Sequence, residues 1–434
     1  METEARRAAW ARGIPAYLAR APRDALAWLA GILVLLVLPF VPGLNNNFGH
    51  SLLSQMGIAA VFALSYNVLL GQTGLLSFGH AVYFGLGGYV AIHGLRLINH
   101  GWPMPVVLLP LLGAAGGLAS GLLIGALTTR RAGTVFAMIS LGVGELVVAA
   151  SLIVTVFFGG EEGITANRTK GSVLLGLNLA SQLQVYYVVM FWVLVSAALL
   201  YAFMRTPAGR MCNAVRDNPE RAEFIGYDPQ RVRLLAFTVS AIFAGVAGGL
   251  HALNYEIVAA EALGAVRSGT VLLMTYIGGV SHFLGPVLGA VVITWLQVSL
   301  SDYTAAWQLY FGLLFILIVL FAPGGLYGLL AAHAPLVRVR TLHKVLGGYA
   351  VALVPGLVMA SGCVLLLEVA YRAATKPELG GKMVLFWMPL DAYQPWPWAL
   401  GVGLSAIGFY AFRRTWPLVA RCWEAASAPL RTPE

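Results

Sequence analysis

The sequence predicts an all-α polytopic membrane protein, from its composition and from the length of its apolar segments. Of its 434 residues, 59% are hydrophobic and only 10% are charged, whereas soluble domains contain about 25% charged residues. Stretches of about 20 apolar residues, the length that crosses a bilayer as a helix, recur along the chain. A chain this apolar cannot cover a water-facing surface. We therefore expect about ten core transmembrane helices and two more in a C-terminal extension.

The expected spans divide the chain into three parts. A cytoplasmic N-terminal segment, 1–25, precedes a transmembrane domain, 26–335, and a C-terminal extension, 336–434, carries the last two spans. The first span begins far from Met1 and no A-x-A cleavage site follows it, so we expect an uncleaved anchor; a mitochondrial presequence is the alternative for the Arg-rich N-terminus. The expected spans lie near 26–43, 51–70, 75–97, 105–128, 133–158, 184–204, 232–253, 267–282, 284–300, 308–330, 347–370 and 397–412.

Basic residues set the expected orientation, because cytoplasmic loops of membrane proteins are enriched in Lys and Arg. Counting across the spans places most basic clusters on the same side of the membrane as the N-terminus. The segment 371–396 is the exception and is expected on the opposite, outer side. The formal charge of +9 then reflects orientation in the membrane, and we expect no nucleic-acid partner. The cytoplasmic clusters are Arg6, Arg7, Arg12, Arg20, Arg23, Arg130-Arg131, the segment 205–233, the segment 338–344 and Arg413-Arg414.

The segment 205–233, which we call the elbow, is a charged island between two spans. It carries six arginines and four acidic residues. Three helix starts of one design lie within it, at Thr206-Pro207, Asn218-Pro219 and Asp228-Pro229, each with a capping side chain before a proline suited to the first helical position. Gly226 supplies a stop, because glycine accepts the left-handed conformation that ends helices. A folded, water-facing structure between spans predicts a docking site for a partner.

Two glycine-rich segments predict broken or re-entrant helices, near 71–80 and near 278–290. The first lies in a stretch, 51–95, that contains no Asp, Glu, Lys or Arg, and Ser77 and His80 are spaced to share a helical face there. Paired interrupted helices in two halves of a transporter indicate its pathway. The alternative is that the glycines are packing contacts between helices and that His80 is a hydrogen-bonded core histidine. The candidate pathway residues in the two breaks are Gly71, Gln72, Gly74, Ser77, His80, Gly279, Gly285 and Pro286.

Glu145 is a carboxylate deep within an expected span. A charge at that depth is costly and normally faces the protein interior or a wet cavity. Two roles stay open for Glu145: it lines the pathway or carries a proton, or it makes a structural hydrogen bond between helices.

Motifs for catalysis and energy conversion are missing from the sequence. There is no G-x-x-x-x-G-K-[ST] run for binding ATP, no H-E-x-x-H or G-x-S-x-G motif and no Arg-rich periodic span typical of a voltage sensor. The cysteines Cys212, Cys363 and Cys422 have no metal-ligand spacing. The sequence therefore predicts a conduit that has no enzymatic activity, metal or cofactor of its own.

Four motifs, far apart in the sequence, occur in one order: Gly71, Gly74, Ser77, Gly79, His80 and Ala81; Gly144-Glu145; Arg216, Asn218, Pro219, Ala222 and Gly226; and Gly278, Gly279, Gly285, Pro286, Gly289 and Ala290. With the loop sequence GGEEGI at 159–164, they resemble the permease subunits of branched-chain amino acid ABC importers. The match is to the LivM-like branch, a family that also contains urea and amide permeases. The resemblance covers residues 30 to 330 or so and its motifs are specific in combination.

The resemblance implies a multi-pass protein of the bacterial inner membrane, in contact with lipid and with its N-terminus in the cytoplasm. Its partners would be a second homologous permease, two cytoplasmic ATPase subunits that bind ATP, and a periplasmic substrate-binding protein. The elbow would dock on an ATPase subunit, with Asn218 as the cap, Pro219 as the first helical residue, and Arg216 and Glu220 as polar contacts. Ala222 and Gly226 complete that motif. Branched-chain amino acids are the implied cargo, with urea or short amides as the alternative.

Two departures from the family's pattern limit the resemblance. Ser281-His282 stands where the family usually has a Gly-Thr or Gly-Ser pair. The extension 336–434 has no counterpart, and we expect a peripheral helical hairpin there. An ion-coupled secondary transporter is the alternative function, in which Glu145 carries an ion or proton and the elbow needs no partner. For an intramembrane enzyme the sequence offers no supporting set of residues.

Overall fold

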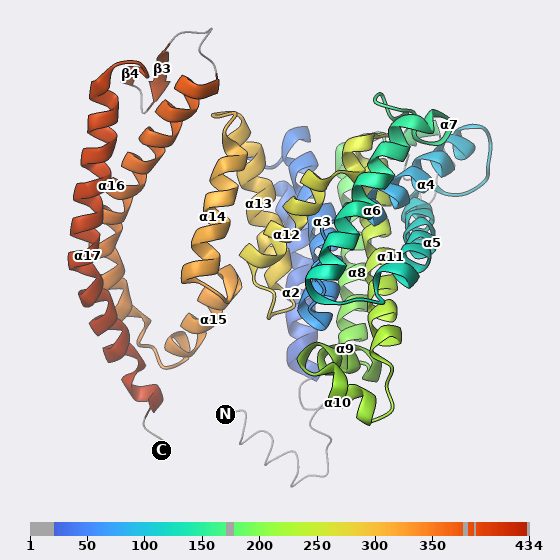
Figure 1. Ribbon diagram of the computed structural model, residues 1–434, viewed down its shortest axis with the longest axis horizontal. Coiled ribbons are helices and arrows are strands. Elements are labelled where there is room, and N and C mark those ends of the chain that lie inside the picture. The colour runs from blue at the N-terminus through green and yellow to red at the C-terminus, as the bar shows by residue number, and fades with distance from the viewer. Residues whose placement is uncertain (1–20, 171–177, 376–380, 386–387, 432–434) are drawn as a thin grey trace. The chain divides into compact units, whose positions relative to one another are not determined.

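In the computed structural model, residues 21–170, 178–375, 381–385 and 388–431 are described. Among them, seven helices are long and apolar enough to cross a membrane, or eight if one bent pair counts as a single span. The prediction of an all-α polytopic membrane protein is confirmed (Figure 1). The apolar helices Trp28–Phe40 and Gly285–Ser301 are shorter, so the number of crossings stays a prediction. Of the expected N-terminal segment 1–25, residues 1–20 lie outside the described residues.

The chain divides into two compact units, of which the first comprises 1–299 and 323–326. Within it, two strands from distant loops, β1 and β2, pair antiparallel. Its elements are α2 (Ala21–Val37), η1 (Leu38–Phe40), α3 (Asn47–Asn67), η2 (Val68–Thr73), α4 (Ala81–Asn99), η3 (Val106–Leu108), α5 (Leu109–Thr128), α6 (Gly133–Ile153), α7 (Thr155–Phe158), β1 (Ile164–Thr165), η4 (Arg168–Lys170), α8 (Gln182–Arg205), α9 (Pro207–Asp217), α10 (Pro219–Phe224), α11 (Pro229–Tyr255), β2 (Ile257–Val258), η5 (Ala260–Leu263), α12 (Ala265–Gly278) and α13 (Gly285–Ser301).

The second unit comprises 300–322 and 327–434. Its two longest helices, α16 and α17, pack against each other and are connected through an antiparallel pair of strands that the sequence had not indicated. The phenol of Tyr310 donates a hydrogen bond of 2.8 Å to Glu368 and ties α14 to α16. The elements that complete the chain are α14 (Trp307–Phe321), α15 (Gly325–Arg338), α16 (Leu342–Thr375), β3 (Lys382–Leu385), β4 (Met388–Asp391) and α17 (Pro395–Arg431).

Glycines hold α4, α5 and α11 close together in the first unit. A Cβ atom added at Gly245 of α11 would overlap the carbonyl oxygen of Gly113 in α5, and one at Gly87 of α4 would overlap Gly245. Backbones that approach this closely leave no room for a side chain, which is how small residues serve helix packing in membranes. For Gly87, therefore, the structure shows the packing role.

The two expected helix breaks are present, with shifted boundaries. The π-helical turn η2 ends at Thr73, Gly74 after it has φ +69°, and no α-helix resumes before Ala81. The expectation that Ser77 and His80 share a helical face is therefore wrong. At the second break α12 ends at Gly278, Gly279 has φ +115°, and α13 begins at Gly285.

The expected span 308–330 is not continuous. It is divided into α14 and α15, which are bent by 43°. Pro323 lies in the interruption and has no N–H for a helical hydrogen bond, and Gly325 after it has φ +68°. A single helix was predicted because hydropathy alone does not register this local backbone chemistry.

Candidate coupling site

The elbow folds into the short helices α9 and α10, which lie together at one end of α8 and α11 (Figure 1). All three predicted caps are confirmed: Thr206 accepts from the N–H of Gly209, Asn218 from that of Arg221 at 2.9 Å, and Asp228 from that of Gln230 at 2.8 Å. A proline follows each cap in the first turn. Gly226 ends α10 with φ +89°. The sequence between two spans thus encodes a defined structure.

A small apolar core anchors the elbow to the membrane helices. Cys212, Val215 and Ala222 are buried against the side chains of Leu64 and Val232, on α3 and α11. Burial raises the pKa of the Cys212 thiol to about 11, so this thiol stays protonated and unreactive at neutral pH. The elbow is therefore fixed to the ends of the spans it connects.

The opposite side of the elbow presents large apolar side chains to solvent. Phe224 is 89% exposed and Ile225 is 60% exposed, at the end of α10. Glu220 is also exposed. Soluble surfaces normally expose such residues singly, and a pair at the tip of a folded loop indicates an interaction site. No sequence motif marks this pair, although two apolar residues stand out within a charged segment.

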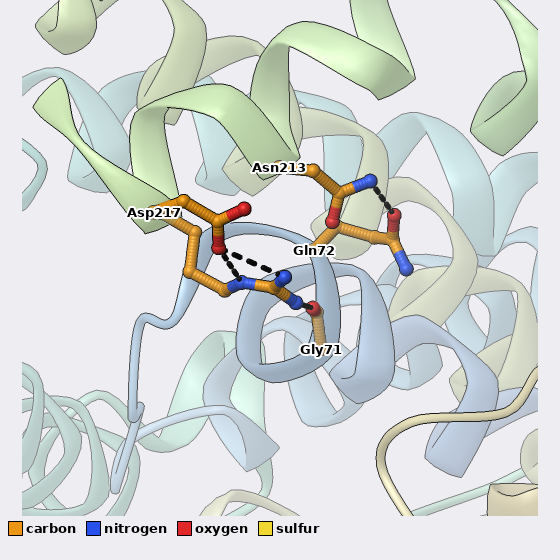
Figure 2. A network of polar contacts seen from close by, with 5 residues as sticks. Gly71, Gln72, Asn213 and Asp217 are labelled. Carbon is orange, nitrogen blue, oxygen red and sulfur yellow. Dashed lines mark hydrogen bonds and ion pairs between the residues drawn. The ribbon is translucent and has the colours of Figure 1, made fainter. Parts of the chain in front are cut away.

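Polar side chains of α9 join the elbow to the first break (Figure 2). The guanidinium of Arg216 donates a hydrogen bond to the carbonyl oxygen of Gly71 and pairs with Asp217 at 3.0 Å. The amide of Asn213 donates to Oε1 of Gln72 at 2.8 Å. We call these bonds the elbow–break contact. Arg216, expected to contact a partner subunit, thus bonds within its own chain, and Asn213 carried no sequence signal at all.

The two breaks adjoin each other beside this contact. A Cβ added at Gly71 would lie 3.1 Å from the carbonyl oxygen of Val280, and one at Gly74 would lie 3.0 Å from Cγ of Arg216. Within the second break, Gly279 is packed against Gly285 and Gly325, and Pro286 is buried in the first turn of α13. The structure therefore brings Gly71, Gly74 and Arg216 together with the second break.

Ser77 and His80 lie apart from that contact, in the protein interior. Both are fully buried; Nε2 of His80 lies 3.1 Å from the hydroxyl of Ser65, and the phenol of Tyr66 donates to the carbonyl oxygen of Ser77. Among the described residues, Nδ1 of His80 and Oγ of Ser77 have no hydrogen-bond partner. Their side chains are thus only partly satisfied.

Glu145 is exposed on α6, next to Leu146, which is 70% exposed. No hydrogen bond or ion pair joins its carboxylate to another described residue of the chain. The structure therefore leaves this carboxylate at the surface of the single subunit, on a face made of apolar side chains.

The first unit is a helical membrane domain with two paired breaks, and a folded loop is hydrogen-bonded to the first of them. This arrangement defines a class, the membrane transport permeases. The family described as branched-chain amino acid transport system / permease component matches residues 48–323. The chain belongs to that family. The extension beyond residue 323 lies outside the match.

Relatives of the chain are transport subunits. It is similar to the high-affinity branched-chain amino acid transport system permease protein LivM of Salmonella typhimurium and of Escherichia coli, each 28% identical over 293 residues, covering 62% of this chain and 67% of the relative. It is also similar to the autoinducer 2 import system permease protein LsrC of an Enterobacter species, 28% identical over 305 residues, covering 65% and 82%. No solved structure matches the chain. The chain is thus a permease subunit of an ABC importer.

Proposed function

We propose that this subunit carries branched-chain amino acids across a bacterial inner membrane, with its N-terminus in the cytoplasm. It works beside a second homologous permease, two ATPase subunits that bind and hydrolyse ATP, and a periplasmic binding protein. The observation that carries the proposal is the elbow–break contact, because it joins the surface suited to an ATPase directly to an interruption in the helices.

Docking and transmission use opposite sides of the elbow. Phe224 and Ile225 enter an apolar groove of the ATPase, flanked by Glu220, while the buried side holds Cys212 against α3 and α11. Closure of the nucleotide-bound ATPases moves α10 and α9 together. Arg216 and Asn213 then pull on Gly71 and Gln72 and change the conformation of the first break. ATP shifts the permease between outward and inward access only to the extent that it binds the two states unequally.

The names of the relatives indicate the class of cargo. The LivM relatives are named for branched-chain amino acid transport, whereas LsrC is named for autoinducer 2 import, so related subunits serve different solutes. Urea or a short amide is the alternative cargo within the same mechanism. An ion-coupled secondary transporter is disfavoured, because it gives no role to the exposed Phe224 and Ile225.

Reconstitution of the complete complex in proteoliposomes tests the proposal. With the binding protein on one side and ATP on the elbow side, radiolabelled leucine is expected to cross, and uptake is expected to stop when ATP is omitted. Radiolabelled urea is measured in parallel. Leucine uptake that persists on an ion gradient without ATP would refute the ABC mechanism, and ATP-driven uptake of urea alone would change the cargo.

A further inference from the structure

A second polar cluster lies in the first unit, around Arg267 in the first turn of α12. This side chain is partly buried. Its guanidinium carbon lies 4.5 Å from the centre of the Phe84 ring, and its Nη2 atom lies 3.4 Å from Nδ1 of His251. These contacts place a cation against two rings, one from α4 and one from α11.

The charge of Arg267 is poorly compensated where it lies. Among the described residues, no carboxylate comes within 4.0 Å of the guanidinium. The carboxylate of Glu261 on η5 acts on it electrostatically from beyond that distance. The N-terminus of a helix carries a partial positive charge and disfavours a cation in the first turn. An uncompensated cation in a membrane protein is costly and typical of a substrate or ion pathway.

The cluster adjoins the first break on one side and an exposed ring on the other. The hydroxyl of Ser268, next to Arg267, accepts a hydrogen bond of 3.0 Å from the N–H of Ala81, where α4 begins after the break. The ring of His251 lies 4.5 Å from that of Tyr255, which is 41% exposed. The cluster therefore extends through His251 to an exposed ring at the surface of the subunit.

We propose that Arg267 binds the carboxylate of the transported solute, and that Glu261 attracts its ammonium group. A guanidinium holds a carboxylate through two parallel hydrogen bonds, and the exposed ring of Tyr255 provides apolar contact for an aliphatic side chain. Opposite charges held apart suit a zwitterionic amino acid and offer little to a neutral solute such as urea. This inference rests on the proposed import function and adds to it a site that discriminates between the two candidate cargoes.

The test uses the reconstituted complex with saturating binding protein, and it measures leucine uptake per ATP hydrolysed. Arg267→Met, which removes the charge and keeps an unbranched apolar chain, is expected to lower that ratio about tenfold or more. Arg267→Lys is expected to retain intermediate uptake, and Glu261→Gln to weaken leucine uptake less. Arg131→Gln serves as the matched control, because it removes an exposed arginine far along the chain from this cluster.

Chemical rescue separates binding from a structural role. In a background with Cys363→Ser and Cys422→Ser, Arg267→Cys is treated with 2-aminoethyl methanethiosulfonate, which restores a positive charge, or with the neutral methyl reagent. Recovery of leucine uptake with the charged reagent alone supports the site. Wild-type uptake by Arg267→Met, or failure of both lysine and the charged reagent to restore it, overturns the site and leaves the import function standing. If the wild-type complex transports urea and not leucine, the proposed cargo is wrong, whatever the Arg267 variants show.

Discussion

The guanidinium of Arg216 donates its hydrogen bond to the carbonyl oxygen of Gly71, a residue 145 positions earlier in the chain. One residue belongs to the water-facing elbow and the other to an interrupted membrane helix. A backbone carbonyl that no helical N–H satisfies is available to such a donor. The bond therefore couples the two segments without using any side chain of the break itself.

Removal of the elbow–break contact is expected to uncouple ATP hydrolysis from transport. In Arg216→Ala with Asn213→Ala, leucine uptake per ATP is expected to fall about tenfold, since hydrogen bonds to charged groups contribute about 1.5–3 kcal/mol. Association with the ATPase, measured by copurification, is expected to persist. Arg231→Ala is the control, because that side chain is 88% exposed and, among the described residues, pairs only with Asp228 three positions earlier. An unchanged uptake-to-ATP ratio in the double variant would show that the contact transmits nothing.

Truncation of the apolar tip of the elbow is expected to weaken binding of the ATPase. Phe224→Ala with Ile225→Ala removes the two exposed side chains, and an affinity loss of about tenfold or more is expected for apolar anchors at an interface. The thermal stability of the permease itself is expected to stay unchanged, because Phe224 makes few contacts within the chain at 89% exposure. Phe48→Ala, at 63% exposure in the first turn of α3, is the control; equal losses in both variants contradict the assignment.

A side chain at Gly245 is expected to destabilise the first unit. Gly245→Val would drive atoms into the backbone of α5 at Gly113 and Gly117, and overpacking of this kind costs about 1–3 kcal/mol or more. The midpoint of thermal unfolding in detergent is the measurement. Gly142→Val on α6 is the control, because nothing lies within 4 Å of a Cβ at that position. A wild-type midpoint for Gly245→Val would show that these helices are not held at backbone distance.

Replacement of Glu145 is expected to lower transport without preventing assembly. Because this carboxylate is exposed on α6, Glu145→Gln leaves the interior packing untouched, and leucine uptake is expected to fall severalfold because an acid within a membrane span is typical of a transport pathway. Copurification with the other subunits measures assembly. Glu145→Asp retains the charge and is the matched variant; full uptake in Glu145→Gln would assign the residue no part in the pathway.

Local backbone chemistry was predictable from the sequence, and side-chain partners across the chain were not. Caps and prolines act over three or four residues, so Thr206, Asn218 and Asp228 could be assigned from their neighbours. The same holds for the chain breaks at Gly74 and Gly279. The bond between Arg216 and Gly71 depends on how α9 packs against η2, and a single sequence contains no information on that packing. Arg267 belongs to no motif, and it lies at the start of the expected span 267–282, where a basic residue is common.

The interruption between α14 and α15 illustrates the limit of hydropathy. Windows of about 20 residues average over Pro323 and Gly325, so they report one span where the backbone changes direction by 43°. The exposed pair Phe224 and Ile225 shows the reverse problem. When the elbow is described only by its many charged residues, the two apolar residues within it go unnoticed.

The close approach of α4, α5 and α11 at Gly87, Gly113 and Gly245 makes these helices a single stiff body. The helix α11 begins at Pro229, within the elbow, and at 1.5 Å per residue its 27 residues extend about 40 Å. Backbones in direct contact cannot slide past one another without separating first. A tilt applied at the elbow end of α11 would therefore move α4 and α5 along with it, over a length that is enough to cross a bilayer.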